Sequence, residues 1–194
     1  MPRKTKVVPH RRRREQRTDY RQRLKLLKSG SPRLVVRRSN NGVLCQIVEY
    51  NSKGDKVLVS STYKDLTKLG WTANSGNLPA AYLTGFLCGK KALGGKIKAA
   101  IFDQGLYKSV KGSRLYATLK GAIDAGLEVP HSEDALPEEN RVSGKHISDY
   151  AAKLKKENPS AYKKLFSGYL KSNSQPENLP ALFQAVKTKI QSDK

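Results

Sequence analysis

The stretch LVVRRSNNGVLCQIVEYNSKGDKVLVSST, residues 34–62, decides the fold. It contains three runs rich in branched residues, at 34–38, 43–50 and 57–62, and the turn sequences SNNG and NSKG separate them. Valine and isoleucine favour the pleated surface of a strand, while Asn and Gly tolerate the backbone conformations of tight turns. Strands joined by tight turns pair with their neighbours in sequence. This stretch therefore predicts an antiparallel three-strand meander.

After residue 62 the pattern changes to helices around one further strand. We predict a short helix over 64–69, a long apolar helix that begins after Asn77 and ends at 94–95, a strand over 98–103 in the centre of the sheet, and a helix capped by Ser113. Helix, strand and helix after a meander indicate the α/β class, with a mixed sheet and helices packed on it.

Two extensions flank this core. Residues 1–17 have no hydrophobic period and are expected to form an extended arm, and a short helix capped by Thr18 should follow to about Ser29. Residues 131–144 have the composition of an exposed connection, and several helices are predicted from Lys145 onward. We expect three parts: a basic arm with a short helix at 1–30, the α/β core at 31–130, and a connecting loop with a helical C-terminal extension at 131–194.

The charge is concentrated at the ends of the chain. Residues 1–38 carry 15 Lys and Arg against two acidic residues, whereas the whole chain has a net charge of +22. Residues 39–140 are almost neutral, and residues 141–194 carry +7. A surface that positive needs a polyanion, and the planar guanidinium of arginine suits phosphate better than lysine does. The charge pattern therefore predicts binding to nucleic acid.

The sequence offers little for catalysis, metal binding or membrane insertion. No apolar stretch approaches the roughly 20 residues of a membrane span, and we expect no membrane partner, cofactor, metal or small-molecule substrate. Two cysteines, Cys45 and Cys88, are too few for a zinc site and are expected to be buried and reduced. The segment 89–96 lacks the lysine and hydroxyl of a P-loop, so we interpret it as the end of a helix.

Several side chains outside the arm are also suited to RNA. Arg37 and Arg38 continue the charge onto the first hairpin, and the short polar side chains of Ser39, Asn40 and Asn41 can bind RNA hydroxyls and base edges.

A later loop adds a possible anion site. Lys108, Lys111 and Ser113 precede a helix, whose free N–H groups favour an anion. Tyr63 could stack on a base, although a half-buried position at a strand end is the more common role.

The ordered motifs of the chain resemble one family. They are RRRREQRTDY at 11–20, RL at 23–24, LKSG at 27–30, PRLV at 32–35, RSN at 38–40, GW at 70–71, NLPAAYLTG at 77–85, GAIDAGL at 121–127 with PH at 130–131, and GKHI at 144–147 with Tyr150. Together they resemble the 5S rRNA-binding family of large-subunit ribosomal proteins, which comprises protein eighteen of archaea and protein five of eukaryotes. The resemblance runs from about residue 9 to 155, and the length favours the archaeal form.

The resemblance implies a structural, non-enzymatic role in the cytoplasm, within the ribosome. Its implied partners are 5S rRNA, the large-subunit rRNA to which 5S rRNA is anchored in the central protuberance, and neighbouring ribosomal proteins. It also implies an α/β core whose sheet and N-terminal extension face RNA. The residues carried over as RNA contacts are Arg11, Arg12, Arg13, Arg14, Arg17, Tyr20, Arg21, Arg23, Lys28, Arg33, Arg38, Ser39 and Asn40.

Two other classes stay open at this point. A non-ribosomal RNA chaperone or RNA-modification subunit would share the basic surface. A metal-dependent nuclease would use Asp103 at the end of its strand. One carboxylate is too few for two-metal chemistry, which needs several acids at one site, and a structural Asp at a strand end is the simpler interpretation.

Overall fold

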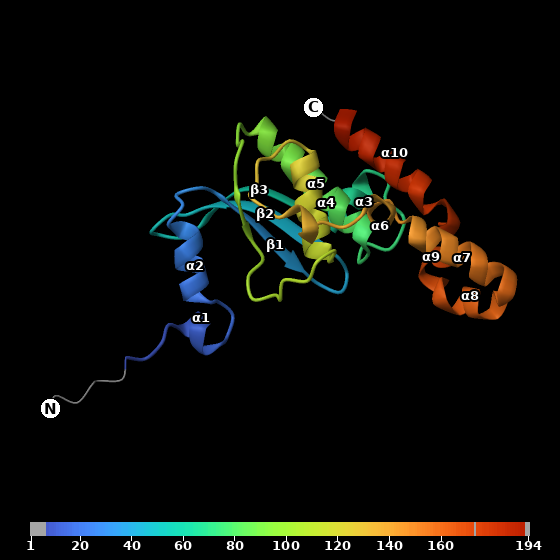
Figure 1. Cartoon of the computed structure of the whole chain (residues 1–194), viewed down its shortest axis with the longest axis horizontal. Helices are drawn as coiled ribbons and strands as arrows, with labels where there is room; N and C mark the ends of the chain where they lie inside the picture. The colour runs from blue at the N-terminus through green and yellow to red at the C-terminus, as the bar shows by residue number, and fades with distance from the viewer. Residues whose placement is uncertain (1–6, 173, 193–194) are drawn as a thin grey trace.

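The computed structural model describes residues 7–172 and 174–192 and contains a four-stranded mixed sheet (Figure 1). The strands are β1 (Arg33–Arg38), β2 (Val43–Glu49), β3 (Lys56–Thr62) and β4 (Ile101–Asp103). Their order is β3-β2-β1-β4; the first three strands pair antiparallel, and β4 runs parallel to β1. The predicted meander and the predicted fold class are confirmed.

The fourth strand differs from the prediction. It lies at the edge of the sheet instead of the centre, and it covers only the last three residues of the expected 98–103. The Ala100 N–H donates to the Glu128 carbonyl, and the Glu128 N–H donates to the Lys98 carbonyl. Residues 98–100 thus make an isolated parallel bridge, between Ala99 and Glu128, with the chain that follows the next helix. The ladder with β1 starts only at Ile101, because β1 itself begins at Arg33.

Ten α-helices and two short 3₁₀ helices, Glu133–Ala135 and Pro176–Asn178, accompany the sheet in the described part of the chain; the α-helices are given next. They are α1 (Arg11–Arg14), α2 (Tyr20–Leu27), α3 (Tyr63–Lys68), α4 (Leu78–Gly94), α5 (Arg114–Asp124), α6 (Glu139–Val142), α7 (Lys145–Glu157), α8 (Pro159–Leu165), α9 (Ser167–Lys171) and α10 (Leu179–Ser192). The long helix begins as predicted, because the Asn77 side chain accepts a hydrogen bond from the Ala80 N–H at 2.9 Å.

Two local predictions were wrong at the helix starts, and a third was confirmed in its position only. The arm is not extended throughout, since residues 11–14 form one helical turn. Asp19 rather than Thr18 caps α2, because its carboxylate reaches the N–H groups of Arg21 and Gln22. Ser113 occupies the cap position of α5, but its hydroxyl makes no capping hydrogen bond.

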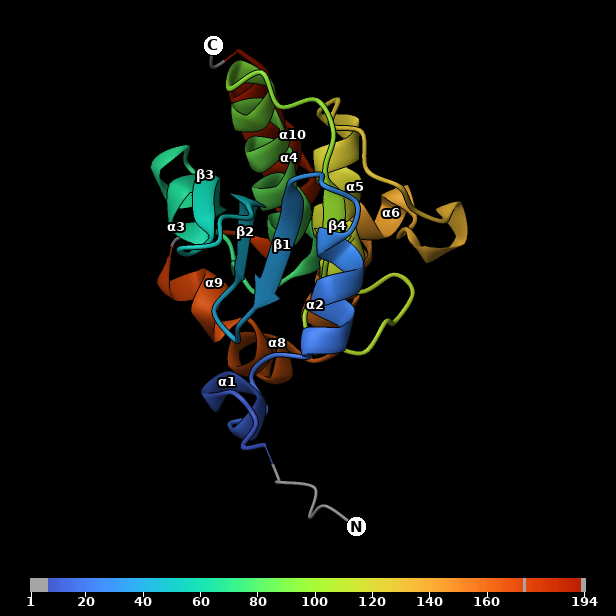
Figure 2. The same cartoon turned by 90° about the vertical axis from the view of Figure 1, so that its left-hand side faces the viewer.

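The helices lie on both faces of the sheet. Helices α4 and α5 cover one face, and α2 lies against the opposite face (Figures 1 and 2). Alternation along the strands points Leu34 and Val36 of β1, and Cys45 and Ile47 of β2, into the core beneath α4 and α5, where all four are fully buried. Arg33 and Arg37 take the other face. Cys45 and Cys88 are both buried and unbridged.

The C-terminal segment packs on the core through α10. Its Phe183 ring lies 5.5 Å from the ring of Tyr82 on α4, and Val186 and Ile190 are almost fully buried. The expected exposed connection at 131–144 is partly buried, because Val142 of α6 is covered. Within the described ranges, no helix has the length and apolar character needed to cross a membrane.

Two glycines allow α4 and α5 to approach closely. A Cβ atom on Gly85 of α4 would overlap the Thr118 carbonyl of α5, and one on Gly121 of α5 would overlap the Tyr82 carbonyl of α4. The obstacle in each case is backbone, which cannot move aside as a flexible side chain can. The helix pair therefore has no room for even one methyl group at these positions.

We expect Gly85→Ala to separate these helices and to lower the free energy of unfolding by about 3 kcal/mol, the upper range for overpacking a core. The melting temperature should fall by roughly 6–12 °C for a chain of this size. Gly94→Ala is the matched control, since a Cβ there meets nothing within 4 Å. Circular dichroism melting of both variants tests this, and equal melting temperatures would contradict it.

Candidate nucleic-acid interface

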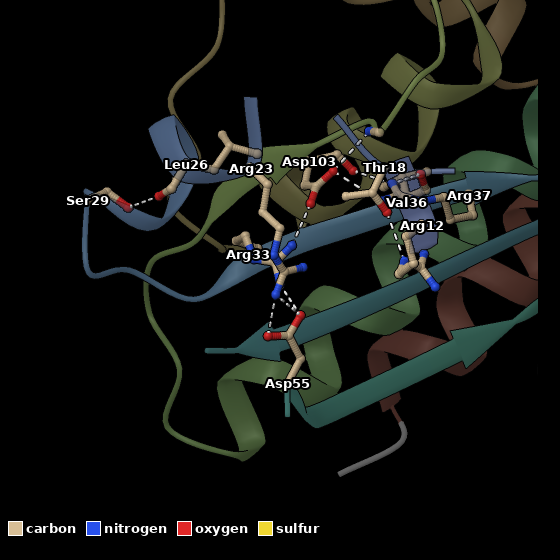
Figure 3. A network of polar contacts seen from close by, with 11 residues as sticks. Arg12, Thr18, Arg23, Leu26, Ser29, Arg33, Val36, Arg37, Asp55 and Asp103 are labelled. Atoms are coloured by element: carbon tan, nitrogen blue, oxygen red, sulfur yellow. Dashed lines mark hydrogen bonds and ion pairs between the residues drawn. The ribbon is translucent and has the colours of Figure 1, made fainter. Parts of the chain in front are cut away.

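A chain of alternating arginines and aspartates lies on the sheet face opposite α4 and α5 (Figure 3). At its centre is Arg33, whose side chain is only 3% exposed. One end of its guanidinium donates to Asp103 Oδ2 at 2.7 Å and the other end donates to Asp55. Asp103 also binds Arg37 at 3.1 Å, and Asp55 binds Arg23 at 2.8 Å. The network thus joins α2, the β2–β3 turn, β1 and β4.

The positions of these residues follow from the strand register. Val35 is directly opposite Asp103 in the parallel pair of β1 and β4, so Asp103 falls between Arg33 and Arg37 along β1. The Arg37 side chain also donates to the Asp103 and Val36 carbonyls, both at 2.8 Å. A buried charge is tolerated only when it is paired and hydrogen-bonded. Arg33 and Asp103 balance each other's charge at this edge of the sheet, while the Arg33 Nε has no hydrogen-bond partner in the described residues.

The pairing shifts the titration of Asp103. Burial by itself raises the pKa of this carboxyl, but the Arg37 charge and the hydrogen bonds from Arg33, Arg37 and the Gly105 N–H outweigh it. The net result is a pKa below the ordinary value of 3.8. Asp103 is therefore ionised at neutral pH and is committed to two arginines. This confirms its interpretation as a structural residue at a strand end.

The arm and α2 extend this basic face. The Arg12 Nε donates to Thr18 Oγ1 at 2.9 Å, and Glu15 bonds Arg17 at 3.3 Å. The four arginines of α1 are exposed. A cleft of about 320 Å³ separates the arm and α2 from β1, and it is lined by Arg12, Arg17, Arg23, Arg33, Arg37, Asp103 and several neighbours.

The β1–β2 turn is held from two sides. Tyr107 donates from its hydroxyl to the Arg38 carbonyl at 2.9 Å. Arg114 donates to the Ser39 carbonyl at 3.1 Å and to the Gly76 carbonyl at 3.0 Å. These contacts brace the turn that carries Asn40 and Asn41. The sequence alone carried no sign that Tyr107, Arg114 and Asp55 have these roles, because their partners are distant in the chain.

The structure places most of the candidate residues at the surface. The exposed ones are Arg11, Arg12, Arg13, Arg14, Arg17, Arg21, Lys28, Arg38, Ser39, Asn40, Asn41, Lys108 and Lys111. Tyr20, Arg23, Arg37 and Ser113 are partly buried.

Arg33 and Tyr63 take positions that suit other roles. The guanidinium of Arg33 is enclosed by two carboxylates, so it is not free to bind a phosphate. Tyr63 is half-buried, and its ring lies where a Cβ on Gly42 would be. These contacts favour the half-buried, structural interpretation of Tyr63.

Comparison with known proteins identifies the family. A sequence model described as "Ribosomal large subunit proteins 60S L5, and 50S L18" matches residues 4–98 and 94–132. The chain belongs to this family. It is also 51% identical over 183 residues to the large ribosomal subunit protein uL18 of Methanococcus maripaludis, an alignment that covers 94% of each chain.

Membership gives the chain a structural role in the large ribosomal subunit, with rRNA and ribosomal proteins as partners. It works in the cytoplasm as part of the ribosome and is not an enzyme. This confirms the resemblance noted from the motifs. Family membership replaces the two alternative interpretations, a nuclease and a non-ribosomal chaperone. In residues 7–172 and 174–192, no three His, Cys, Asp or Glu side chains gather in a way that could hold a metal.

We expect Asp103→Asn to lower the free energy of unfolding by about 3 kcal/mol at neutral pH, because it leaves buried arginine charge unbalanced. Since folding depresses the Asp103 pKa, the stabilisation is fully present above the unfolded value of about 3.8 and is lost as the pH falls through the lower folded value. The difference in free energy of unfolding between the native chain and the variant should therefore become smaller in acid.

Urea unfolding at a series of pH values measures this gap. Asp134→Asn serves as the control, because that carboxylate is exposed and lies 3.9 Å from its nearest partner, Lys111. A gap that stays constant down to the lowest pH would show that the Asp103 charge does not carry the effect.

Proposed function

We propose that the chain binds 5S rRNA through the arm, α2 and the β1–β2 turn, and that it anchors this RNA to the large-subunit rRNA. The observation that carries the proposal is a division among the arginines of the arm, α2 and β1. Arg23, Arg33 and Arg37 are neutralised by Asp55 and Asp103. The arginines of α1, and Arg21 and Arg38, are left at the surface.

This division suits a phosphate-binding surface. The paired arginines form a rigid base whose charge is already balanced. The exposed ones keep their charge and their hydrogen-bond donors at the surface for an external polyanion, and Arg11 alone among the α1 arginines lies near a carboxylate in the described residues, 3.7 Å from the exposed Glu15. Phosphate contacts would supply most of the affinity and the orientation, while the short polar side chains of Asn40 and Asn41 would read RNA shape and unpaired bases.

A second basic region supports the anchoring role. Exposed lysines of α7, α8 and α9 lie at the far end of the molecule from α1, with the sheet and α4 between them (Figure 1). Two basic ends on an almost neutral core suit a protein held between two RNA segments. We assign the arm end to 5S rRNA and the lysine-rich end to the large-subunit rRNA.

We expect replacement of Arg11, Arg12, Arg13 and Arg14 by Ala to weaken 5S rRNA binding and to flatten its salt dependence. If each arginine neutralises one phosphate, the slope of log K against log salt should become shallower by about 3. The matched control replaces Lys156, Lys163, Lys164 and Lys171 by Ala, which removes the same charge from the far end. Filter-binding titrations measure both slopes, and equal flattening in the two variants would contradict the assignment.

Selectivity for 5S rRNA is tested by competition. Unlabelled 5S rRNA should displace labelled 5S rRNA from the full chain at a concentration at least about tenfold below that of tRNA. The gel shift is run near 150 mM salt, where surface charge is partly screened and non-specific binding is weak. Equal competition by the two RNAs would overturn the proposed partner.

A further inference from the structure

The loop between β4 and α5 forms a hollow against the end of β1. The hollow is about 430 Å³ and is lined by Arg38, Leu106, Tyr107, Lys108, Val110, Ser113 and Leu115. Gly105 and Gly112 bound the loop, and both adopt positive φ angles, +65° and +67°, that side-chain-bearing residues rarely adopt. This volume lies within the range of ligand pockets in proteins.

Arg38 is held differently from the other arginines of β1. Its guanidinium carbon lies 5.0 Å from the centre of the Tyr107 ring, and the Tyr107 hydroxyl bonds the Arg38 carbonyl. No carboxylate in the described part of the chain pairs with it, whereas Arg33 and Arg37 both bind Asp103. The Tyr107 ring thus holds the planar guanidinium of Arg38 in place, and no carboxylate in the described residues balances the charge of that guanidinium. Guanidinium planes of this kind stack on unpaired RNA bases.

The surroundings of Arg38 combine apolar side chains with positive charge. Leu106 is 54% exposed and Val110 is 57% exposed, and Lys108 and Lys111 lie beside them in the loop. The Ser113 hydroxyl is shielded from solvent yet has no hydrogen-bond partner in the described residues. A nucleotide would satisfy all three features: its base has apolar faces, its edges bind hydroxyls, and its phosphate attracts lysine.

The hollow is continuous with the proposed 5S rRNA surface. Leu106 lines it, and Leu106 also lines the cleft that contains Arg12 and Arg17 and a neighbouring hollow that contains Arg13 and Tyr20. In Figure 2 the loop that follows β4 runs beside α2. An RNA strand that follows the arm would reach the loop across these two hollows, whose lining is mostly basic or neutral and includes one exposed carboxylate, Asp19.

We propose that this hollow receives one unstacked base of 5S rRNA, which stacks on the free plane of Arg38. The inference rests on the proposed function and adds a binding mode to it. Arg38 contacts the base directly, and Tyr107 is a positioning residue that holds the guanidinium plane. Leu106 and Val110 flank the base, and the Ser113 hydroxyl bonds its edge.

The test compares two variants of the full chain in 5S rRNA binding. Arg38→Lys keeps the charge and removes the plane, and Tyr107→Leu removes the ring that supports it. Base stacking contributes about 1–3 kcal/mol, so Arg38→Lys should weaken binding roughly 5- to 150-fold. The salt slope should stay unchanged, because the number of neutralised phosphates is the same. Tyr107→Leu should weaken binding in the same way.

The matched controls are Arg141→Lys and Tyr150→Leu, both exposed residues outside the interface, and both should bind like the native chain. Thermal melting of the free variants shows whether they are folded. Ultraviolet cross-linking of the native complex provides a readout independent of any variant: a peptide from residues 106–111 should cross-link to one unpaired nucleotide.

Two results would overturn the inference and tell it apart from the proposed function. In the first, 5S rRNA outcompetes tRNA and the arm sets the salt slope, but Arg38→Lys binds normally and the loop does not cross-link. The base-binding role of the hollow is then wrong, while the proposed function stands. If 5S rRNA has no advantage over tRNA, the proposed function fails, and the assignment of a 5S rRNA base fails with it.

Discussion

One buried ion pair, between Arg33 and Asp103, sets the geometry on which the basic face depends. Taking these charges out of water is costly, and the cost is offset only because each group finds several hydrogen bonds in a fixed direction. Arg33 also reaches Asp55, which in turn binds Arg23 of α2. Three other segments of the chain are thereby tied to the first residue of β1. Contacts with Arg33 or with its partner Asp55 hold β4, α2 and the β2–β3 turn in position.

The network also decides how the surplus charge is distributed. A chain of net charge +22 repels itself, and self-repulsion destabilises a compact state. Asp55 and Asp103 remove that cost where arginines must be close together, at the sheet. Most of the remaining arginines are exposed on the arm, on α2 and at the end of β1, where solvent screens their charge. The core can therefore fold while the surface stays strongly positive.

The sequence predicted the elements whose signals are local. The β1 to β3 meander followed from its turns, and the start of α4 followed from Asn77. The predictions that failed required distant partners. The fourth strand was expected in the centre, but residues 98–100 bond the segment after α5, and the sequence does not show that pairing. Arg33 carried the same basic signal as its exposed neighbours, and only the register of β4 against β1 brings Asp103 to it.

By itself the sequence determined the basic arm, the three-strand meander, the absence of a convincing catalytic motif and the motifs typical of the family. These properties depend on composition and on residues close together in the chain. Tertiary structure alone decided which arginines face an external partner. A guanidinium that the fold encloses beside a carboxylate is not available to RNA, and the carboxylates that hold Arg23, Arg33 and Arg37 come from segments 22 to 70 residues away. Such pairing is a property of the folded sheet and not of the local sequence.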